Sequence, residues 1–434
     1  MQAAAARAVE LAQSCGATQS EAGASGDEGL SVTARMGELE SVERELNRGI
    51  GITVYRNGSK GTASTTELSD DAIEATVGKA LSIAEHTAAD EHAGLAPAEL
   101  MGRAGADLDL FHPWDIDVAG ATELALQTEQ SARDVDRRIE NSEGATISTE
   151  CGYRAYANSH GFVGGHATSS HAISCSVIAR GEGGLERDYW WSGARCADDL
   201  SAGEEVGRRA AERAVARLGS RQIDTCRVPV VYPPELARGL LAHFVAAIRG
   251  ASLYRRASFL LDSAGTQIFP EYVSIEEQPH LPRAFGSAVF DGDGVETRAR
   301  LLIDSGTLTG YVLSAYSARR LGLQTTGNAG GVHNLCVAPT GGALEEIIAG
   351  LDRAFVVGEL LGQGANIVTG DYSRGAAGFW VERGAIAYPV SEVTIAGHLS
   401  DMFSRIDVVG SDVDPRGVIR TGTIVVAEMT VAGG

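Results

Sequence analysis

The feature that most constrains the fold of this chain is a glycine-rich segment, Gly370 to Glu382, in which polar residues run directly into aromatic ones. The pattern predicts a short strand at Asn366 to Val368, then a tight polar loop, then a β-hairpin. That hairpin joins Phe379–Glu382 to Ala385–Val390 across Arg383-Gly384, because glycine supplies the positive φ that such a turn needs. Polar loops held by rigid strands often carry binding residues. We therefore expect a binding loop within a β-rich C-terminal region.

Composition indicates a large, turn-rich protein. The 54 glycines among 434 residues exceed a usual share of about 7% and favour turn-rich β structure. A single core stops growing near about 250–300 residues, so this length predicts two or more domains. The net charge of −21 argues against nucleic acid and against an anionic membrane surface, since clustered Lys and Arg bind both.

The sequence also favours a cytoplasmic location. It has no apolar run of roughly 18 residues, so we expect no transmembrane helix. The N-terminus lacks the apolar core of a signal peptide, and Glu10 follows soon after. The six cysteines are scattered without a C-x-x-C pair, which suggests reduced and mostly buried thiols.

The order of helical and extended patterns predicts an α+β fold with two domains. Residues 1–225 are expected to form an N-terminal α/β-sandwich-like domain, with sub-regions 1–107 and 108–225 as one interpretation. Residues 226–434 are expected to form a mainly antiparallel β domain with one helix at 234–249, which Pro233-Pro234 would start.

Local signals place several elements. Asn57-Gly58, the strongest short-range hairpin signal, predicts a turn between strands at 52–55 and 59–64. Ser69 is expected to cap a helix, and Ser201 to Glu204 fits a capping box that opens another. Further short strands are expected at 30–35, 38–43, 145–148, 153–158 and 173–179.

The Gly370–Glu382 segment is similar to the C-terminal signature of the PmbA/TldE family, one half of the TldD/TldE-type metalloprotease. The resemblance covers almost the full length. It extends to Gly29–Glu43, Gly49–Thr65, Leu108–Pro113, Asn158–Gly161, Ser252–Leu261 and Tyr316–Asn334. It implies a subunit of a heteromeric metallopeptidase that degrades or trims unfolded or leader peptides together with a TldD-like partner.

The metal ligands expected of a zinc peptidase are missing from the sequence. The H-E-x-x-H motif places two histidines and a glutamate on one helical face, and no histidine here is followed by glutamate. The TldD-type relatives carry an H-E-x-x-x-H version on a helix that matches Pro234 to Arg249, where this chain reads Leu241 to Ala247 with His243 as its one imidazole. They also supply a cysteine near the C-terminus, whereas the last cysteine here is Cys336. The resemblance therefore implies that this chain has no catalytic zinc and that the partner holds it.

Other motifs favour structural roles. His243 is expected to be a hydrogen-bonded core histidine, with a residual role in a shared cleft as the alternative. The sequence spacings of six and five residues cannot place His160, His166 and His171 on one strand face, because side chains alternate between faces. We therefore expect turn and surface histidines. Asp291-Gly292-Asp293-Gly294 resembles the start of a calcium loop, but the EF-hand pattern then fails, which leaves a hairpin turn.

The binding candidates cluster near the signature. Ser373 does not fit a nucleophile elbow. Arg374 could clamp the carboxylate of a peptide terminus or form an ion pair with Asp371 or Glu382, and both stay open. No catalytic or metal-binding residue is assigned. We expect contacts with substrate or partner at Asp371, Tyr372, Ser373, Arg374, Phe379, Trp380, His333 and Asn334.

Two alternatives to the subunit interpretation stay open. The chain could be a metallopeptidase by itself, with a set such as His243, His333 and Cys336, or a non-enzymatic binding protein that regulates others. A homodimer in the absence of the partner is also left open. Peptide capture along a strand edge is the natural binding mode, because main-chain hydrogen bonds accept any extended sequence.

Overall fold

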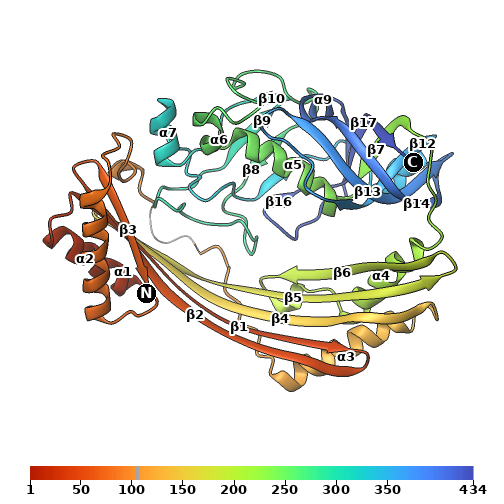
Figure 1. Cartoon of the computed structure of the whole chain (residues 1–434), viewed down its shortest axis with the longest axis horizontal. Helices are drawn as coiled ribbons and strands as arrows, with labels where there is room; N and C mark the ends of the chain where they lie inside the picture. The colour runs from red at the N-terminus through yellow and green to blue at the C-terminus, as the bar shows by residue number, and fades with distance from the viewer. Residues whose placement is uncertain (103–106, 434) are drawn as a thin grey trace.

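The structure, a computed structural model, describes residues 1–102 and 107–433. A long curved sheet formed by the N-terminal half faces a C-terminal half built of two smaller sheets (Figure 1). This arrangement confirms the predicted α+β fold. Within the described residues, no helix is long and apolar enough to cross a membrane.

The N-terminal half is a six-stranded antiparallel sheet with the order β3-β2-β1-β4-β5-β6. Its strands are β1 (Gln19–Arg35), β2 (Glu38–Arg56), β3 (Ser59–Thr65), β4 (Ile139–Asn158), β5 (Val163–Gly181) and β6 (Gly184–Ala194). Its helices are α1 (Gln2–Ser14), α2 (Asp70–His86), α3 (Val118–Arg133) and α4 (Gly203–Ala216), with 3-10 turns at Ala98–Leu100 and Ala197–Asp199. The polar link predicted between 90 and 107 contains residues 103–106, which lie outside the described residues.

The hairpin turn at Asn57-Gly58 is confirmed, but the strands of this sheet are longer than predicted. Asn57 and Gly58 have φ of 54° and 84°, as a two-residue hairpin turn requires. β1, β2 and β4 run for 17, 19 and 20 residues, and the predicted short strands are pieces of them. Alternating apolar residues reveal a strand only where one face is buried, and long stretches of these strands are polar on both faces.

The helices cover one face of the sheet at its two ends. α1 and α2 bury Val9, Ile52 and Ile73 at one end, and α3 and α4 bury Val32 and Val206 at the other. The opposite, concave face is turned toward the C-terminal half (Figure 1). One sheet thus offers both a packed face and a largely polar face.

Of the two predicted helix caps, one is confirmed in its position and the other is wrong. Ser69 lies at the N-cap of α2 as expected, although its side chain makes no capping hydrogen bond. The capping box at Ser201 to Glu204 is wrong, because α4 begins at Gly203 with Ala202 as its N-cap. Ser201 instead donates its backbone N–H to the Ser192 hydroxyl at 2.9 Å, which ties the segment to β6.

The C-terminal half contains a six-stranded sheet, β14-β13-β12-β7-β17-β15, and a five-stranded sheet, β10-β9-β8-β11-β16. Because β14 also pairs with β17, five strands of the larger sheet close into a barrel. The strands are β7 (Cys226–Tyr232), β8 (Ile275–Glu277), β9 (Arg300–Asp304), β10 (Thr307–Leu308), β11 (Leu335–Val337), β12 (Arg353–Leu361), β13 (Asp371–Glu382), β14 (Ala385–His398), β15 (Ile406–Val409), β16 (Ile419–Arg420) and β17 (Ile424–Ala432). The helices are α5 (Pro234–Ile248), α6 (Gly250–Tyr254), α7 (Ala315–Leu321), α8 (Leu344–Ala349) and α9 (Leu399–Ser404).

The single helix predicted for this half corresponds to α5, and four shorter helices follow it. α6, α7, α8 and α9 have only 5, 7, 6 and 6 residues. A segment of this length shows too few turns for a helical period to stand out from the sequence. The expectation of one helix between 226 and 434 is therefore corrected.

The glycine-rich signature is a strand rather than a loop. β13 begins at Asp371 and contains almost all of the predicted loop. The hairpin from β13 to β14 is confirmed, with Arg383 and Gly384 at φ of 52° and 79°. The strand predicted at Asn366 to Val368 is wrong, since this segment is a turn that Gly370 closes by donating to the Asn366 carbonyl at 2.7 Å.

The glycines of β13 permit a close approach between strands. The register of β12 and β13 shifts next to Gly358, which forms a β-bulge. A Cβ on Gly378 would lie 2.0 Å from the carbonyl oxygen of Val356. Only glycine fits there, so the pattern that suggested a flexible loop is a packing requirement.

Candidate functional site

Helix α5, which the family resemblance singles out, exposes one narrow face. Leu240, Leu241 and Phe244 are buried in the C-terminal core, whereas Ala242 is exposed and His243 is half-buried. The prediction that His243 is a core histidine is therefore wrong. Successive residues of a helix point in different directions, so His243 lies beside the buried face that its neighbour Phe244 occupies.

Strand β13 places two signature residues beside this face of α5. The ring of Tyr372 meets that of His243 edge to face, with 6.0 Å between centroids. Arg374 donates through Nη2 to the carbonyl oxygen of Gly362 at 2.7 Å. Burial, and then the charge of Arg374, lower the pKa of His243. Both effects favour the neutral imidazole of His243, which shares its surroundings with a permanent cation.

Arg374 does not form the internal ion pair that was one of its two predicted roles. Asp371 accepts a hydrogen bond from the Thr369 hydroxyl at 2.6 Å, and Glu382 is exposed at the far end of β13. Within the described residues, no ion pair of Arg374 occurs, and its buried Nε has no partner. The guanidinium is held by carbonyl oxygens, which leave its positive charge uncompensated.

The side chains around α5 do not fit a catalytic zinc ion. Such a site needs three protein ligands, and no cluster of three His, Cys, Asp or Glu suited to a metal occurs among the described residues. The alternative set of His243, His333 and Cys336 is therefore not brought together. Both ring nitrogens of His333 lie within hydrogen-bonding distance of carbonyl oxygens, those of Gly286 at 3.2 Å and Gly327 at 3.1 Å.

His333 and Asn334 belong to a buried polar network in the C-terminal half. Glu277, 1% exposed, accepts hydrogen bonds from the His333 backbone N–H at 2.6 Å and from Asn328 at 2.7 Å. Its other oxygen pairs with Arg300 at 2.8 Å. Asn334 is fully buried and has a φ of 41°. The network holds the Gly-rich turn in place, and sequence spacing gave no sign of its central Glu277.

The remaining signature residues lie in three different environments. Asp371 and Ser373 are exposed on β13. Trp380 is 3% exposed and packs in the barrel core, with the Arg353 guanidinium 5.3 Å from its ring centroid. Phe379 lines a cavity of about 830 Å³ between the two halves of the molecule. The eight predicted contact residues are therefore not gathered into one site.

The cavity between the halves is lined by aromatic and charged residues that sequence reasoning missed. Arg416 stacks on both Trp190 and Trp191 of β6, with centroid distances of 4.5 and 4.6 Å. Burial alone would raise the pKa of Asp414, but its hydrogen bonds from Arg416 hold that pKa below its usual value. The adjacent tryptophans were the available signal, because two neighbouring tryptophans are rare. Their partner Arg416 is more than two hundred positions away and could not be paired with them.

The Asp291–Gly294 turn is confirmed as a turn and closes on its own backbone. Oδ1 of Asp291 accepts the backbone N–H groups of Asp293 and Val295, each at 2.9 Å, and Oδ2 accepts that of Ala329 at 2.8 Å. Burial, and then the nearby Asp293 carboxylate, raise the pKa of Asp291 to about 7. Both carboxylate oxygens thus accept backbone N–H groups and hold the local turn.

This turn also joins the two halves. A Cβ on Gly294 would lie 2.7 Å from the ring of Tyr156 in β4, so glycine allows the contact. The Tyr156 hydroxyl donates to Glu21 at 2.7 Å, and burial raises the pKa of Glu21. Phe162 and Phe290 meet edge to face beside it, with centroids 5.1 Å apart.

The three histidines near residue 166 are not all turn and surface residues. His171 is 1% exposed and contacts the Thr149 hydroxyl at 2.9 Å and the His112 carbonyl oxygen at 2.8 Å. Its prediction as a surface histidine is wrong, because it lies on the helix-covered face of β5. His160 and His166 are not fully buried.

Comparison with known proteins gives one consistent family. Residues 21–84, 111–218 and 225–433 match models of domain 1, the central domain and the C-terminal domain of the PmbA/TldA metallopeptidases. The chain is 46% identical over 405 residues to Metalloprotease PmbA of Escherichia coli O157:H7, covering 93% of this chain and 90% of that protein. It is 45% identical over 428 residues to the PmbA homolog of Haemophilus influenzae, covering 98% and 94%.

Solved structures agree at the level of the fold. A crystal structure from Bacteroides thetaiotaomicron VPI-5482 superposes with a TM-score of 0.93 at 25% identity, covering 98% of this chain and 97% of that one. TldE from Thermococcus kodakarensis superposes with a TM-score of 0.87 at 19% identity, covering 98% and 99%. The long sheet and the barrel are thus shared over the whole chain.

Proposed function

Because this chain belongs to the PmbA/TldD metallopeptidase family, we propose that it is the PmbA/TldE-like subunit of a two-protein metallopeptidase. In this proposal a TldD-like partner holds the zinc ion and its general base. This chain completes the cleft and holds unfolded or leader-type peptides for cleavage. In this proposal the chain acts in the cytoplasm, the location that its sequence favours.

The observation that carries the proposal is the outer face of α5. A zinc-binding helix needs two ligands on one face, and this face offers His243 alone beside small residues such as Ala242. The uncompensated charge of Arg374 next to His243 opposes a divalent cation electrostatically. Zinc, when present in the complex, would activate the attacking water from the partner's side of the cleft.

The same surroundings suit the carboxylate of a peptide. Arg374 offers a buried, unpartnered Nε, and arginine recognises carboxylates through its planar fork of donors. Asp371, Ser373 and Phe379 also keep exposed surface at which a peptide or the partner could be contacted. We therefore retain these four residues as the proposed contacts, and we give Tyr372 and Trp380 a supporting role from the core.

The proposal is tested by reconstitution. The chain is co-expressed with a TldD-like protein, the complex is isolated, and cleavage of an unfolded peptide is measured for each protein alone and for the mixture. Cleavage by the mixture, and none by this chain alone, is the expected result. Cleavage by this chain alone would contradict it, and tight peptide binding without cleavage by the mixture would favour a regulatory binding protein instead.

A further inference from the structure

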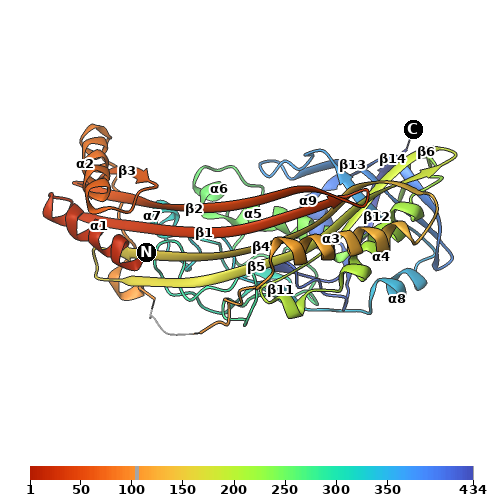
Figure 2. The same cartoon turned by 90° about the horizontal axis from the view of Figure 1, so that it is seen from below.

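One long stretch of β2 has an open edge. β3 pairs only with residues 50–56 of β2, so residues 38–49 have β1 on one side and no described strand on the other. Figure 2 shows β2 as the outer strand of the sheet, with β3 beside it only near α2. At about 3.4 Å per residue this open edge is roughly 40 Å long. Every second residue along such an edge presents an unpaired backbone N–H and C=O.

The open edge also exposes apolar side chains. Leu46 is 79% exposed, Leu39 48% and Val42 41%. Val42 and Leu46 are four positions apart and therefore lie on the same face of the strand. Natural sheets protect edges with prolines, covering elements or charged side chains. No proline occurs between residues 38 and 49, and the protecting devices left to this edge are its charged residues, Glu38, Glu40, Glu43, Arg44, Glu45 and Arg48. A long uncovered edge with apolar side chains is typical of a surface that pairs with another strand.

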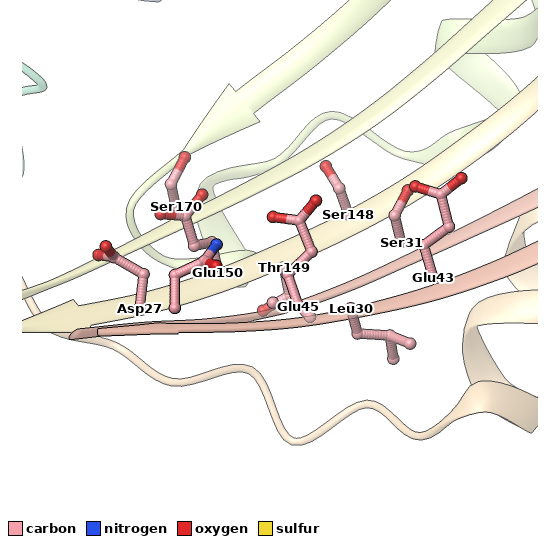
Figure 3. A pocket seen from close by; sticks show the side chains of 11 residues that line it. Asp27, Leu30, Ser31, Glu43, Glu45, Ser148, Thr149, Glu150 and Ser170 are labelled. Atoms are coloured by element: carbon pink, nitrogen blue, oxygen red, sulfur yellow. The ribbon is translucent and has the colours of Figure 1, made fainter. Parts of the chain in front are cut away.

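The other face of the same stretch is acidic. Glu43 and Glu45 of β2, Asp27 of β1 and Glu150 of β4 line a hollow of about 300 Å³. Figure 3 shows Asp27 and Glu43 on one side of the strands and Leu30 on the other. Among the described residues, no Lys or Arg lines this hollow, and the ion pairs of the sheet are formed by other carboxylates. Four neighbouring negative charges are left without a counter-charge.

This charge pattern selects the kind of strand that fits. In a two-fold pairing of two copies of this chain centred on residue 44, Glu43 of each copy would lie opposite Glu45 of the other, and like charges opposite one another destabilise a sheet. A strand with Lys or Arg on one face complements the carboxylates, and apolar residues on its other face cover Val42 and Leu46, which flank Arg44. The net charge of −21 adds a general attraction for a basic segment.

We propose that the open edge of β2 is a docking edge for an extended peptide substrate in which basic and apolar side chains alternate. This inference rests on the proposed function, because the peptide is the one that the metallopeptidase complex cleaves. Backbone hydrogen bonds to β2 supply affinity for any extended sequence. Basic side chains at every second position meet Glu43 and Glu45, and the side chains between them cover Val42 and Leu46.

The first test measures binding of labelled peptides to the full-length chain by fluorescence anisotropy. The probe is an eleven-residue peptide of alternating Lys and Val, and its counterpart carries Glu in place of Lys. Binding of the Lys peptide that weakens with added salt, and no binding of the Glu peptide, is the expected result. Equal binding of the two peptides would overturn the proposal.

The second test asks whether the peptide binds as a strand. Two further peptides carry N-methyl groups on the odd or on the even residues, which removes alternate backbone donors. A strand paired on one edge uses only one of these sets, so one peptide loses binding and the other keeps it. Loss of binding with both sets, or with neither, would contradict strand addition.

The acidic face is tested with matched variants. The double variant Glu43→Gln/Glu45→Gln is expected to weaken binding of the Lys peptide by about fivefold, because two exposed ion pairs are lost. The control Glu67→Gln/Glu74→Gln removes two exposed carboxylates outside the hollow and is expected to leave binding unchanged. An equal effect of the two double variants would mean that only the net charge matters and would overturn the proposal.

A failure of this inference can be distinguished from a failure of the proposed function. Binding uses this chain alone, whereas the proposed function is tested by cleavage in the mixture. If this chain does not bind the Lys peptide but the mixture still cleaves its substrate, the docking edge is disproved and the proposed subunit role stands. If this chain forms a concentration-dependent dimer and Leu46→Asp dissociates it, the edge pairs with a second copy of the chain instead, and the proposal is overturned.

Discussion

The two halves of the molecule differ in the structural role of their sequence motifs. In the C-terminal half, the glycine-rich signature is built into a closed barrel, where Gly378 lets two strands approach and Trp380 is buried. In the N-terminal half, the long strands β1 and β2, which include the family-like segment Gly29–Glu43, leave an open edge and an acidic hollow. The motif that identifies the family is thus mainly a packing signal.

The largest effect that this comparison predicts is at Gly378. Gly378→Ala would place a Cβ 2.0 Å from the Val356 carbonyl oxygen, and the barrel cannot widen there without breaking strand pairs. We expect a loss of about 4 kcal/mol in the free energy of unfolding of the C-terminal half. Urea unfolding followed by tryptophan fluorescence measures it.

The matched control for this variant is Gly239→Ala. Gly239 lies in α5, and a Cβ at this position has nothing within 4 Å. Alanine is the better helix former, so we expect stabilisation by about 0.5–1 kcal/mol. If the two alanines had the same effect, the packing explanation of the signature would be wrong.

A slightly smaller loss is expected from Glu277→Ala. The side chain is buried and compensates Arg300 while it also accepts from Asn328 and the His333 backbone. Its removal leaves a partly buried cation without its partner, which costs about 3 kcal/mol. Glu296→Ala serves as the control, because the half-exposed Glu296 pairs with the exposed Arg298, and it is expected to change stability by less than about 1 kcal/mol. Equal midpoints in urea for both variants would show that the network is not structural.

The junction between the halves predicts a dependence on pH. The pKa of Asp291 is raised to about 7 in the folded chain, against about 3.9 when unfolded. Between these values only the folded chain keeps the proton, so the free energy of unfolding falls as pH rises, by up to about 1.4 kcal/mol per pH unit. The neighbouring Asp293 contributes to the raised pKa of Asp291.

Asp293→Asn is therefore expected to flatten the slope between pH 5 and pH 7. The measurement is the urea midpoint at both pH values for the variant and the unchanged chain. The same slope in both would contradict the coupling between the two carboxyl groups. Exposed Asp71→Asn, in the first turn of α2, is a control that should keep the slope.

The smallest effect is expected at the open edge. Leu46→Ser removes an apolar side chain that is 79% exposed, so the urea midpoint should move by the equivalent of less than about 0.5 kcal/mol. Leu241→Ala in the core of α5 should cost about 2–5 kcal/mol by comparison. A large loss at Leu46 would show that the edge is covered in the folded protein and would remove the contrast between the halves.

Local signals in the sequence predicted much of this fold. Asn57-Gly58 fixed one turn and Arg383-Gly384 another, because each needs backbone conformations that few residues adopt. Helix α5 followed from its proline start and its apolar period. The signature was misjudged as a loop because glycine at a close strand contact and glycine in a turn look alike in a sequence.

The candidate site was less predictable for a physical reason. Arg374 lies without an acidic partner because of how β13 sits beside α5, and the Trp190–Arg416 stack joins residues far apart in the chain. The open edge of β2 depends on where β3 ends. Such features depend on non-local pairing, which no pattern in a single stretch of sequence records.

The central claim, that this chain does not hold the catalytic metal, is tested most directly by metal analysis of the purified full-length protein. The account predicts far less than one zinc per chain after exposure to zinc and removal of the excess, with no change in His243→Ala. Stoichiometric zinc that is lost in His243→Ala would contradict the account, because α5 would then be a metal-binding helix.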